Sequence, residues 1–336
     1  MAKKAFITGI SGQDGSYLSE LLLNKGYEVA GLVRRNAVGE LGNIEHIKED
    51  VQIYFGDLQS PESIALALLD FKPDEIYNLA SLSSPFASFS DKFASIMITG
   101  VGALHVFERA KQIVPQAKIY QASTSEMFGA PKEVPQNENT PFNPANPYAA
   151  AKEFAHRMAV IARCDKSKPQ LITCGILFNH ESPRRGLNFV TRKITAGVAC
   201  IKNGKKEGIP LNEIGQPIVH DGKLKLGDLE AKRDWGYAPD YVEAMWKMLQ
   251  QETADDFVIA TGEVHTVREF AEEAFAVVGL NFKDYVMSDA HFVPPVQTGP
   301  LQGDASKAKK VLGWEPKTKF KDLVKIMVHA DLAKFS

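Results

Sequence analysis

Short apolar runs alternate with stretches of helical spacing along the first half of the chain. The runs that predict strands are residues 4–8, 28–33, 51–55, 75–79, 118–123 and 171–177. Apolar positions recur at helical spacing in Tyr17–Asn24 and Ile96–Lys111, and we expect a further helix from Tyr148 through Arg163. Ser60-Pro-Glu-Ser63 is typical of a helix start. This alternation predicts an α/β protein with a doubly wound parallel sheet.

The pattern changes after residue 178, where the alternation weakens and glycine, proline and charged residues become denser up to Gly236. We predict that residues 1–178, with a return segment at about 232–262, form the main domain. Residues at about 179–231 and 263–336 would form a smaller, interleaved domain that closes over it. Within this part, Lys202–Lys225 is predicted to be an irregular excursion or a hairpin.

Composition narrows the classes of partner. The chain has 336 residues, of which 44% are hydrophobic, so it can bury a large core. Its 39 basic and 41 acidic side chains give a formal charge of -2, which provides no electrostatic basis for binding nucleic acid or an anionic membrane. We therefore predict a small-molecule ligand.

The three cysteines and the N-terminus indicate the compartment. Cys164, Cys174 and Cys200 have neither metal-ligand spacing nor the even count of a disulfide framework, so we predict buried thiols and no metal site. The N-terminus MAKKAFITGI runs directly into the first strand without an apolar signal sequence, and no apolar run is long enough to span a bilayer. The expected location is the cytoplasm.

A glycine turn joins the first strand to the first helix. Gly9, Gly12 and Gly15 would let the backbone turn tightly, let a pyrophosphate approach the helix N-terminus beside Gln13 and Asp14, and let the helix pack on the strand. The alternative is an ordinary strand-to-helix turn. Because the pattern lies between a strand and a helix at the start of the chain, we predict a Rossmann-type dinucleotide site.

The second strand ends in a pair of arginines, where a fold that prefers NAD offers an acidic side chain to the ribose. Arg34 and Arg35 suit a 2′-phosphate instead, which predicts NADP; the alternative is two solvated arginines. After the third strand, Asp57 could bind the adenine amino group beside Leu58. The fourth strand ends at Leu79 and Ala80, where the chain could line the cofactor site.

Candidate catalytic residues lie between Gln121 and Lys152. Tyr148 and Lys152 are four residues apart, so a helix would place the phenol and the ammonium on one face. A nearby cation favours phenolate, and the tyrosine could then act as a base. The end of the preceding strand would aim Thr124 and Glu126 into the same pocket. The alternative is a half-buried tyrosine, a solvated lysine and a loop carboxylate.

These motifs together resemble the extended short-chain dehydrogenase/reductase superfamily, and within it the GDP-mannose 4,6-dehydratase family. The likeness covers nearly the whole chain. It is carried by GQDGSYL at 12–18, YQASTSEMFG at 120–129, GILFNHESPRRG at 175–186, FVTRKIT at 189–195, KRDWG at 232–236 and DFVIATG at 256–262.

The resemblance implies a mechanism. Tyr148, supported by Lys152, would take the proton of the sugar 4-hydroxyl while C4 is oxidised, and Thr124 would hydrogen-bond the 4-oxygen. Glu126 would then take the C5 proton and assist loss of the 6-hydroxyl as water. The product would be a 4-keto-6-deoxy sugar. The resemblance also implies cofactor contacts from Tyr148, Lys152, His180 and Arg185, and substrate contacts from Ser83, Ser125, Asn179, Lys193 and Arg233. An interdomain ion pair is the alternative for Arg233.

Three segments depart from the family pattern, and one of them is the excursion at Glu207–Lys223, which is longer than the family norm. Ser81-Leu-Ser-Ser84-Pro85 stands where the family usually has Ala-Gln-Ser-His-Val, and Val293-Pro-Pro-Val296-Gln297 replaces Arg-Pro-x-Glu-Val. The expected substrate is GDP-mannose, and the departures leave a GDP-heptose or another sugar nucleotide open. A nucleotide-sugar 4-epimerase or 4-keto reductase, which would leave Glu126 idle, and a non-catalytic NADP-binding regulatory protein are further alternatives. The double-arginine loop of the family reaches a neighbouring subunit, which implies a homodimer or homotetramer.

Overall fold

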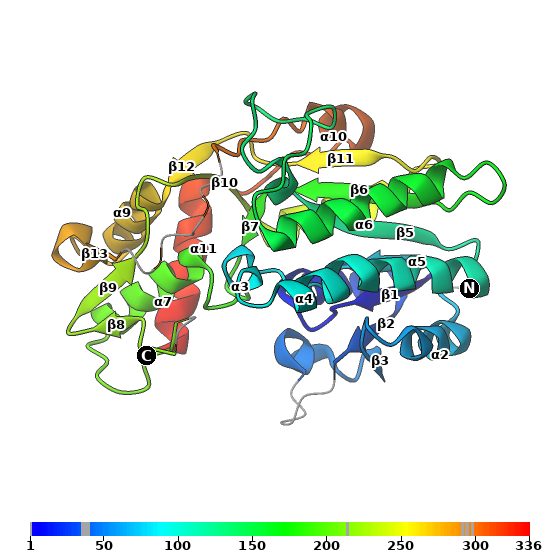
Figure 1. The fold of residues 1–336 in the computed structure, drawn as a ribbon. Coiled ribbons are helices and arrows are strands. Elements are labelled where there is room, and N and C mark those ends of the chain that lie inside the picture. Colours follow the sequence, from blue (N-terminus) through cyan, green and yellow to red (C-terminus); the bar gives the residue numbers. More distant parts are fainter. Residues whose placement is uncertain (1, 35–40, 213–214, 290–291, 293–295, 297–298) are drawn as a thin grey trace.

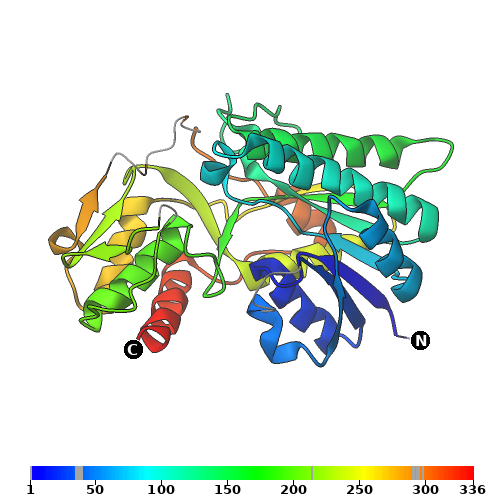
Figure 2. The same ribbon diagram turned by 60° about the horizontal axis from the view of Figure 1, so that its bottom comes forward.

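The computed structural model describes residues 2–34, 41–212, 215–289, 292, 296 and 299–336. Figures 1 and 2 show a larger lobe built around a long sheet and a smaller lobe beside one end of that sheet. In the larger lobe the described strands form a parallel sheet of seven. In spatial order they are β11 (Asp256–Ile259), β6 (Ile172–Leu177), β5 (Lys118–Thr124), β4 (Glu75–Asn78), β1 (Lys4–Thr8), β2 (Glu28–Val33) and β3 (Val51–Phe55).

This strand order confirms the Rossmann-type fold. Phe6 of β1 is aligned with Ala30 of β2 on one side and with Ile76 of β4 on the other. The chain therefore reverses direction across the sheet between β1 and β4. Open parallel sheets bind ligands at such a point, outside the carboxyl ends of the strands.

Helices cover both faces of this sheet, because successive strand side chains point to opposite faces. One face packs Ala5 and Ile7 against α1 (Gln13–Asn24), α8 (Ala238–Leu249) and α10 (Ser306–Leu312). The other face packs Phe6 against α2 (Pro61–Phe71), α5 (Gly102–Ile113) and α6 (Pro147–Cys164). Full burial of each large apolar side chain contributes about 1.5–3 kcal/mol, so the two cores together stabilise the sheet.

The smaller lobe has its own apolar core, which contains Trp235, Phe270 and Met327. Its three main helices are α7 (Val190–Lys202), α9 (Val267–Val277) and α11 (Phe320–Lys334). Two small sheets complete it: β12 (Val264–Thr266), β10 (Lys232–Tyr237) and β7 (Asn179–Glu181) in one, and β13 (Val286–Ser288), β9 (Lys223–Leu226) and β8 (Val219–His220) in the other. β8 and β9 pair antiparallel, so the predicted excursion ends in a hairpin.

Most predicted elements have the expected positions, and one helix is different. The three strands predicted first coincide with β1, β2 and β3, but the helix predicted at Ile96–Lys111 is divided. A π-helical segment, η2 (Ser95–Val101), precedes α5, and α3 (Pro85–Ser88) and α4 (Lys92–Ala94) lead into it. A side chain at Gly100 would come within 3.2 Å of Phe154 and 3.4 Å of the Ala151 carbonyl, so glycine lets this segment lie closely against α6.

Short 3-10 turns complete the described chain at η1 (Gly42–Ile47), η3 (Ser125–Phe128) and η4 (Phe282–Asp284). The prediction of three buried thiols is wrong for Cys164, which is exposed because it ends α6; Cys174 and Cys200 are buried.

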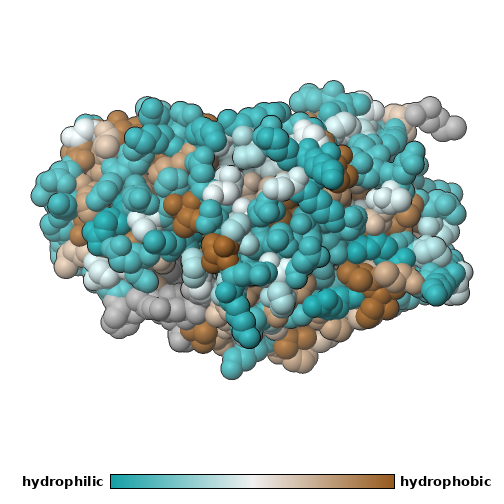
Figure 3. Space-filling view, turned by 90° about the horizontal axis from the view of Figure 1, so that it is seen from above, coloured by the Kyte–Doolittle hydropathy of each residue, from teal (hydrophilic) through white to brown (hydrophobic). Residues whose placement is uncertain are grey.

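Within the described residues, none of the helices combines the length and apolar character needed to cross a bilayer. The face in Figure 3 is mainly hydrophilic, and its hydrophobic side chains occur in small separate groups.

Candidate active site

Two clefts open at the carboxyl edge of the large sheet. The first, which we call the cofactor cleft, has a volume of about 340 Å³. Its lining contains the residues predicted for a dinucleotide at Gly9, Gly12, Gln13, Asp14, Gly15, Arg34, Asp57, Leu58, Leu79, Ala80 and Arg185. They come from the ends of β1, β2, β3 and β4 and from the segment after β7. The sheet topology thus gathers residues that are up to 176 positions apart in the chain.

The glycine turn has the close approaches that its sequence predicts. Gly9 has a φ of +73°, and a Cβ there would lie 2.9 Å from the Ala80 Cα. A Cβ at Gly15 would lie 2.4 Å from the Gly9 carbonyl oxygen, so only glycine allows α1 to start this close to β1. Among the side chains that the structure describes, none caps the start of α1, and its first backbone N–H groups are therefore available for a phosphate.

Asp14 and His180 form a partly buried pair across the two lobes. His180 Nε2 lies 2.9 Å from Asp14 Oδ2, and His180 Nδ1 lies 2.8 Å from the Phe178 carbonyl oxygen. Burial alone would raise the pKa of Asp14, but the charge and hydrogen bond of His180 lower it to about 2. Burial lowers the pKa of His180, but Asp14 outweighs burial and raises it above its ordinary value.

His180 therefore uses both ring nitrogens within the protein, and among the described residues it does not line the cofactor cleft. Its predicted cofactor contact stays a prediction. Gln13 strengthens the same junction, because its side chain donates to the His180 carbonyl at 3.1 Å and accepts from the Ser182 hydroxyl at 2.8 Å. The junction fixes the glycine turn against the segment that carries Arg185.

The arginines of the cofactor cleft come from different segments. Arg34 follows β2, is exposed and lines the cleft, whereas Arg35 lies outside the described residues. Arg185 Nε lies 3.2 Å from the Glu181 carboxylate, and its guanidinium stacks 3.6 Å from the centre of the Phe189 ring. These contacts fix the direction of Arg185 before any ligand arrives. On the opposite side of the cleft, the Asp57 carboxylate accepts from the Gln59 backbone N–H at 2.9 Å.

The end of β5 delivers Thr124 and Glu126 together. Thr124 caps the short η3 turn by accepting from the Glu126 backbone N–H at 3.3 Å. Both side chains are almost fully buried, and the Glu126 carboxylate lines the second cleft. An amide group holds this carboxylate, because Asn146 Nδ2 donates to Glu126 Oε2 at 3.0 Å.

Tyr148 and Lys152 lie one turn apart at the start of α6, and both are buried. Burial raises the pKa of the Tyr148 phenol well above its ordinary value; Glu126 adds to this rise, while a hydrogen bond with Thr124 and the charge of Arg185 oppose it. Burial lowers the pKa of the Lys152 ammonium to about 8. Lys152 Nζ donates to the Ala122 carbonyl at 2.8 Å and lies 5.8 Å from the Tyr148 ring centre. Its expected support of the phenolate stays a prediction.

The second cleft, which we call the substrate cleft, lies between the lobes and has a volume of about 520 Å³. Glu126, Asn179 and Arg233 are the predicted site residues in its lining. Asn179 Oδ1 is buried and has no hydrogen-bond partner among the described residues, so it is available to a bound ligand. Arg233 Nη1 donates to the Lys232 carbonyl at 2.7 Å.

The other predicted substrate residues have different surroundings. Ser83 lies in the lining of the cofactor cleft rather than the substrate cleft. Ser125 is buried in η3, and Lys193 is buried in α7 with its Nζ 4.5 Å from the centre of the Phe292 ring. Within the described residues, neither of these two side chains lines either cleft, and their substrate contacts stay predictions.

Two features of the substrate cleft were not predicted from the sequence. Phe86 and Phe89, from α3 and its C-terminal cap, form part of its wall, and Asn146 holds Glu126. Asn146-Pro147 at a helix start was the available signal for a capping residue. The sequence could not show that the amide nitrogen of Asn146 donates to the carboxylate of Glu126, which lies 20 positions earlier.

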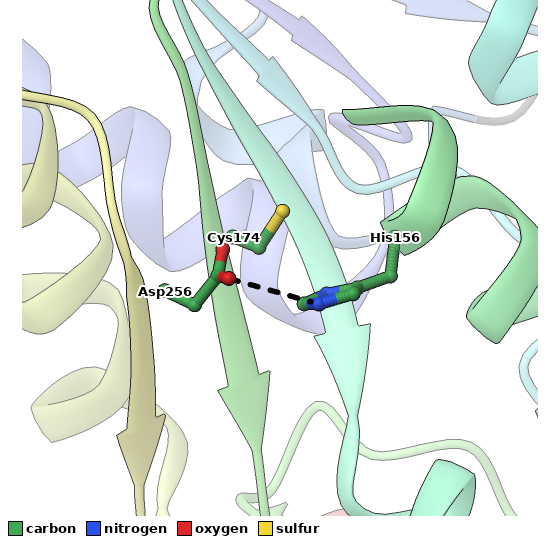
Figure 4. Close-up of side chains that lie close together, drawn as sticks. All are labelled: His156, Cys174 and Asp256. Carbon is green, nitrogen blue, oxygen red and sulfur yellow. Dashed lines mark ion pairs between the residues drawn. The ribbon is translucent and has the colours of Figure 1, made fainter. Parts of the chain in front are cut away.

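His156, Cys174 and Asp256 form a separate cluster in the large lobe, shown in Figure 4. His156 Nε2 is 3.8 Å from Asp256 Oδ2, and Arg163 binds both Asp256 oxygens at 2.9 and 3.0 Å. The guanidinium already neutralises the carboxylate, and burial raises the pKa of the Cys174 thiol well above its ordinary value. This arrangement disfavours a cation and joins α6 to β6 and β11.

Comparisons with known proteins agree along nearly the whole length of the chain. The family model described as GDP-mannose 4,6 dehydratase matches residues 6–327. A relative from Arabidopsis thaliana, GDP-mannose 4,6 dehydratase 2, is 48% identical over 343 residues, which cover 98% of this chain and 87% of that protein.

Solved structures with lower identity share the fold. The dTDP-glucose 4,6-dehydratase of Bacillus anthracis, solved in complex with NAD, matches with a TM-score of 0.79 and 22% identity, covering 98% of this chain and 96% of that one. RMD from Pseudomonas aeruginosa, complexed with NADPH, has a TM-score of 0.79 and 19% identity, covering 99% and 100% of the two chains.

Proposed function

The chain belongs to the GDP-mannose 4,6-dehydratase family, and on that premise we propose that it converts GDP-mannose to GDP-4-keto-6-deoxymannose with NADP as its cofactor. The observation that carries this proposal is the buried Glu126 carboxylate, which lines the substrate cleft and interacts electrostatically with Tyr148. A dehydratase needs a base at C5 in addition to the base at the 4-hydroxyl. An epimerase or a 4-keto reductase does not need that second base.

The cofactor cleft fits a nicotinamide dinucleotide. Gly9 and Gly15 leave room where a Cβ would collide with backbone, and the first N–H groups of α1 face a site suited to a pyrophosphate. When bound, the cofactor supplies the oxidant for C4, the reductant for C6 and a positive charge near Tyr148. Solved relatives contain NAD or NADPH. Arg34 in the cleft lining supports a 2′-phosphate and therefore NADP.

Tyr148 takes the proton from the sugar 4-hydroxyl in this proposal. Its burial opposes ionisation, and its hydrogen bond with Thr124 and the charge of Arg185 offset part of that cost. Lys152 places an ammonium one helical turn away. Thr124 then hydrogen-bonds the 4-oxygen, which holds the sugar at a fixed distance from Tyr148.

Glu126 acts at the next carbon. Oxidation at C4 acidifies the C5 hydrogen, and the carboxylate takes that proton and returns one to the 6-hydroxyl as it leaves as water. Asn179 and Arg233 are proposed to bind the sugar nucleotide, whose diphosphate suits a guanidinium. Ser83, Ser125 and Lys193 are proposed as further contacts by their match to the family pattern. The altered segment at Ser81–Pro85 keeps a GDP-heptose or another nucleotide sugar as the alternative substrate.

The decisive assay mixes purified protein with NADP⁺ and GDP-mannose and follows product mass and the absorbance of reduced nicotinamide. We expect loss of one water without lasting reduced cofactor. Glu126→Gln should lose water elimination and retain C4 oxidation, while Glu252→Gln, an exposed glutamate outside both clefts, should behave as wild type. Simple epimerisation or lasting reduced cofactor in the wild type would contradict the dehydratase assignment. Dehydration only of another sugar nucleotide would keep the reaction and change the substrate.

We also propose a cytoplasmic location and a homodimer or homotetramer in which the double-arginine loop of the family reaches a neighbouring subunit. The family resemblance supports this assembly. Light scattering during size-exclusion chromatography will measure the subunit count, and a mass of one chain at assay concentration would refute the proposed assembly.

A further inference from the structure

Asn146 connects the start of α6 to the candidate C5 base. Its Oδ1 accepts from the Ala149 backbone N–H at 2.8 Å, and its Nδ2 donates to Glu126 Oε2 at 3.0 Å. Asn146 and Glu126 both line the substrate cleft. One amide group therefore caps a helix with its oxygen and holds a carboxylate with its nitrogen.

The chemistry of the two partners fixes the orientation of this amide. A backbone N–H can only donate, so the Asn146 oxygen faces Ala149 and the NH₂ group must face Glu126. Within the described residues, Asn146 provides the one side-chain hydrogen bond to this carboxylate, and Glu126 Oε1 accepts none. The contact leaves Oε1 available for a proton from the substrate.

Other capping residues would lose one of the two functions. Serine and aspartate are strong N-caps, so either can satisfy the Ala149 N–H. A serine whose hydroxyl caps the helix has too short a side chain to reach Glu126 at the same time. An aspartate would place a second carboxylate against it, where like charges repel. The capping role and the contact with Glu126 can therefore be separated by substitution.

We propose that Asn146 is a positioning residue for water elimination: it holds the Glu126 carboxylate toward C5 and is not needed for oxidation at C4. The inference rests on the proposed role of Glu126. In that step the C5–H bond breaks and its proton goes to Glu126 Oε1. A C5=C6 double bond forms as the C6–O bond breaks, and Glu126 returns the proton to the departing hydroxyl, so water leaves and the carboxylate is restored.

The test compares Asn146→Ser and Asn146→Asp with the wild-type holoenzyme and GDP-mannose. A charge-assisted hydrogen bond to the base is lost in both, so we expect elimination to slow about 10- to 100-fold. Elimination is followed by deuterium incorporation at C5 from heavy water and by product mass. The rate of C4 oxidation, read as a transient rise of reduced nicotinamide in a single turnover, should stay within about twofold of wild type.

Asn281→Asp is the matched control, because Asn281 caps η4 in the smaller lobe by accepting from the Lys283 backbone N–H. It should leave both rates unchanged. Equal slowing of oxidation and elimination in Asn146→Ser would mean that Asn146 only caps the helix and would overturn the inference. Wild-type elimination in both Asn146 variants, with elimination abolished in Glu126→Gln, would also overturn it and leave the proposed function intact. Wild-type C5 exchange in Glu126→Gln would instead refute the role of Glu126 itself.

Discussion

Replacing His180 with phenylalanine should weaken the junction between the glycine turn and the smaller lobe. His180 stacks on Tyr241 with ring centres 4.7 Å apart, and its Nε2 pairs with Asp14 at 2.9 Å. Phenylalanine preserves the ring and its stacking but removes both nitrogens. The substitution thus leaves the partly buried Asp14 carboxylate without its main partner.

The size of the effect follows from the shifted pKa of Asp14. Burial raises that pKa, but His180, together with Gln13 and Arg185, lowers it from 3.8 to about 2, which corresponds to roughly 2.5 kcal/mol of preference for the carboxylate. The raised pKa of His180 describes the same interaction from the other side, so the two contributions are not added.

The pH dependence has a definite sign. The folded pKa of His180 lies above the unfolded value of about 6.5, so its contribution is complete below that value and is lost as pH rises through the folded pKa. The contribution of Asp14 is present above its unfolded pKa and is lost as pH falls toward about 2. The pair therefore stabilises the fold most between about pH 4 and about pH 6.5.

Urea unfolding of wild type, His180→Phe, Asp14→Asn and the double variant measures the coupling free energy. We expect about 2–3 kcal/mol at about pH 5.5 and less than about 1 kcal/mol at about pH 9, where neutral histidine retains only a hydrogen bond. The exposed pair Lys309–Glu315 is the control and should show no measurable coupling. A coupling below about 0.5 kcal/mol at the lower pH, or one that is equal at both, would refute the reasoning.

Three further predictions concern Lys152 and the cofactor cleft. Lys152→Met should abolish catalysis but leave the free energy of unfolding nearly unchanged or raise it. The reason is that burial, which lowers the pKa of the Lys152 ammonium to about 8, costs the folded protein roughly 3 kcal/mol. Thermal unfolding and activity assays together test this, and a large loss of stability contradicts it. Gly9→Ala should destabilise the fold by about 2 kcal/mol more than Gly26→Ala, since both have positive φ but only Gly9 meets Ala80; equal urea midpoints would refute the clash. Arg34→Ala should raise the KM for NADP⁺ at least about tenfold and leave that for NAD⁺ unchanged; equal effects on both would exclude a 2′-phosphate contact.

Local patterns of the chain were sufficient for the scaffold. Strand and helix periods are properties of neighbouring residues, and they predicted β1, β2 and β3 with their observed bounds. The glycine turn was also local, because a positive φ at Gly9 favours glycine whatever surrounds it. Glu126, Tyr148 and Lys152 were identified as a group because a long sequence motif carries them together.

Only the tertiary structure decided how residues distant in sequence meet. It paired Asp14 with His180, placed Ser83 in the cofactor cleft, and set Asn146 against Glu126. It also introduced the π-helical segment before α5, where packing on α6 overrode a regular helical pattern. The physical reason is that helical and strand periods constrain a residue against its near neighbours, whereas the partner of a buried polar group depends on which strands and lobes lie side by side.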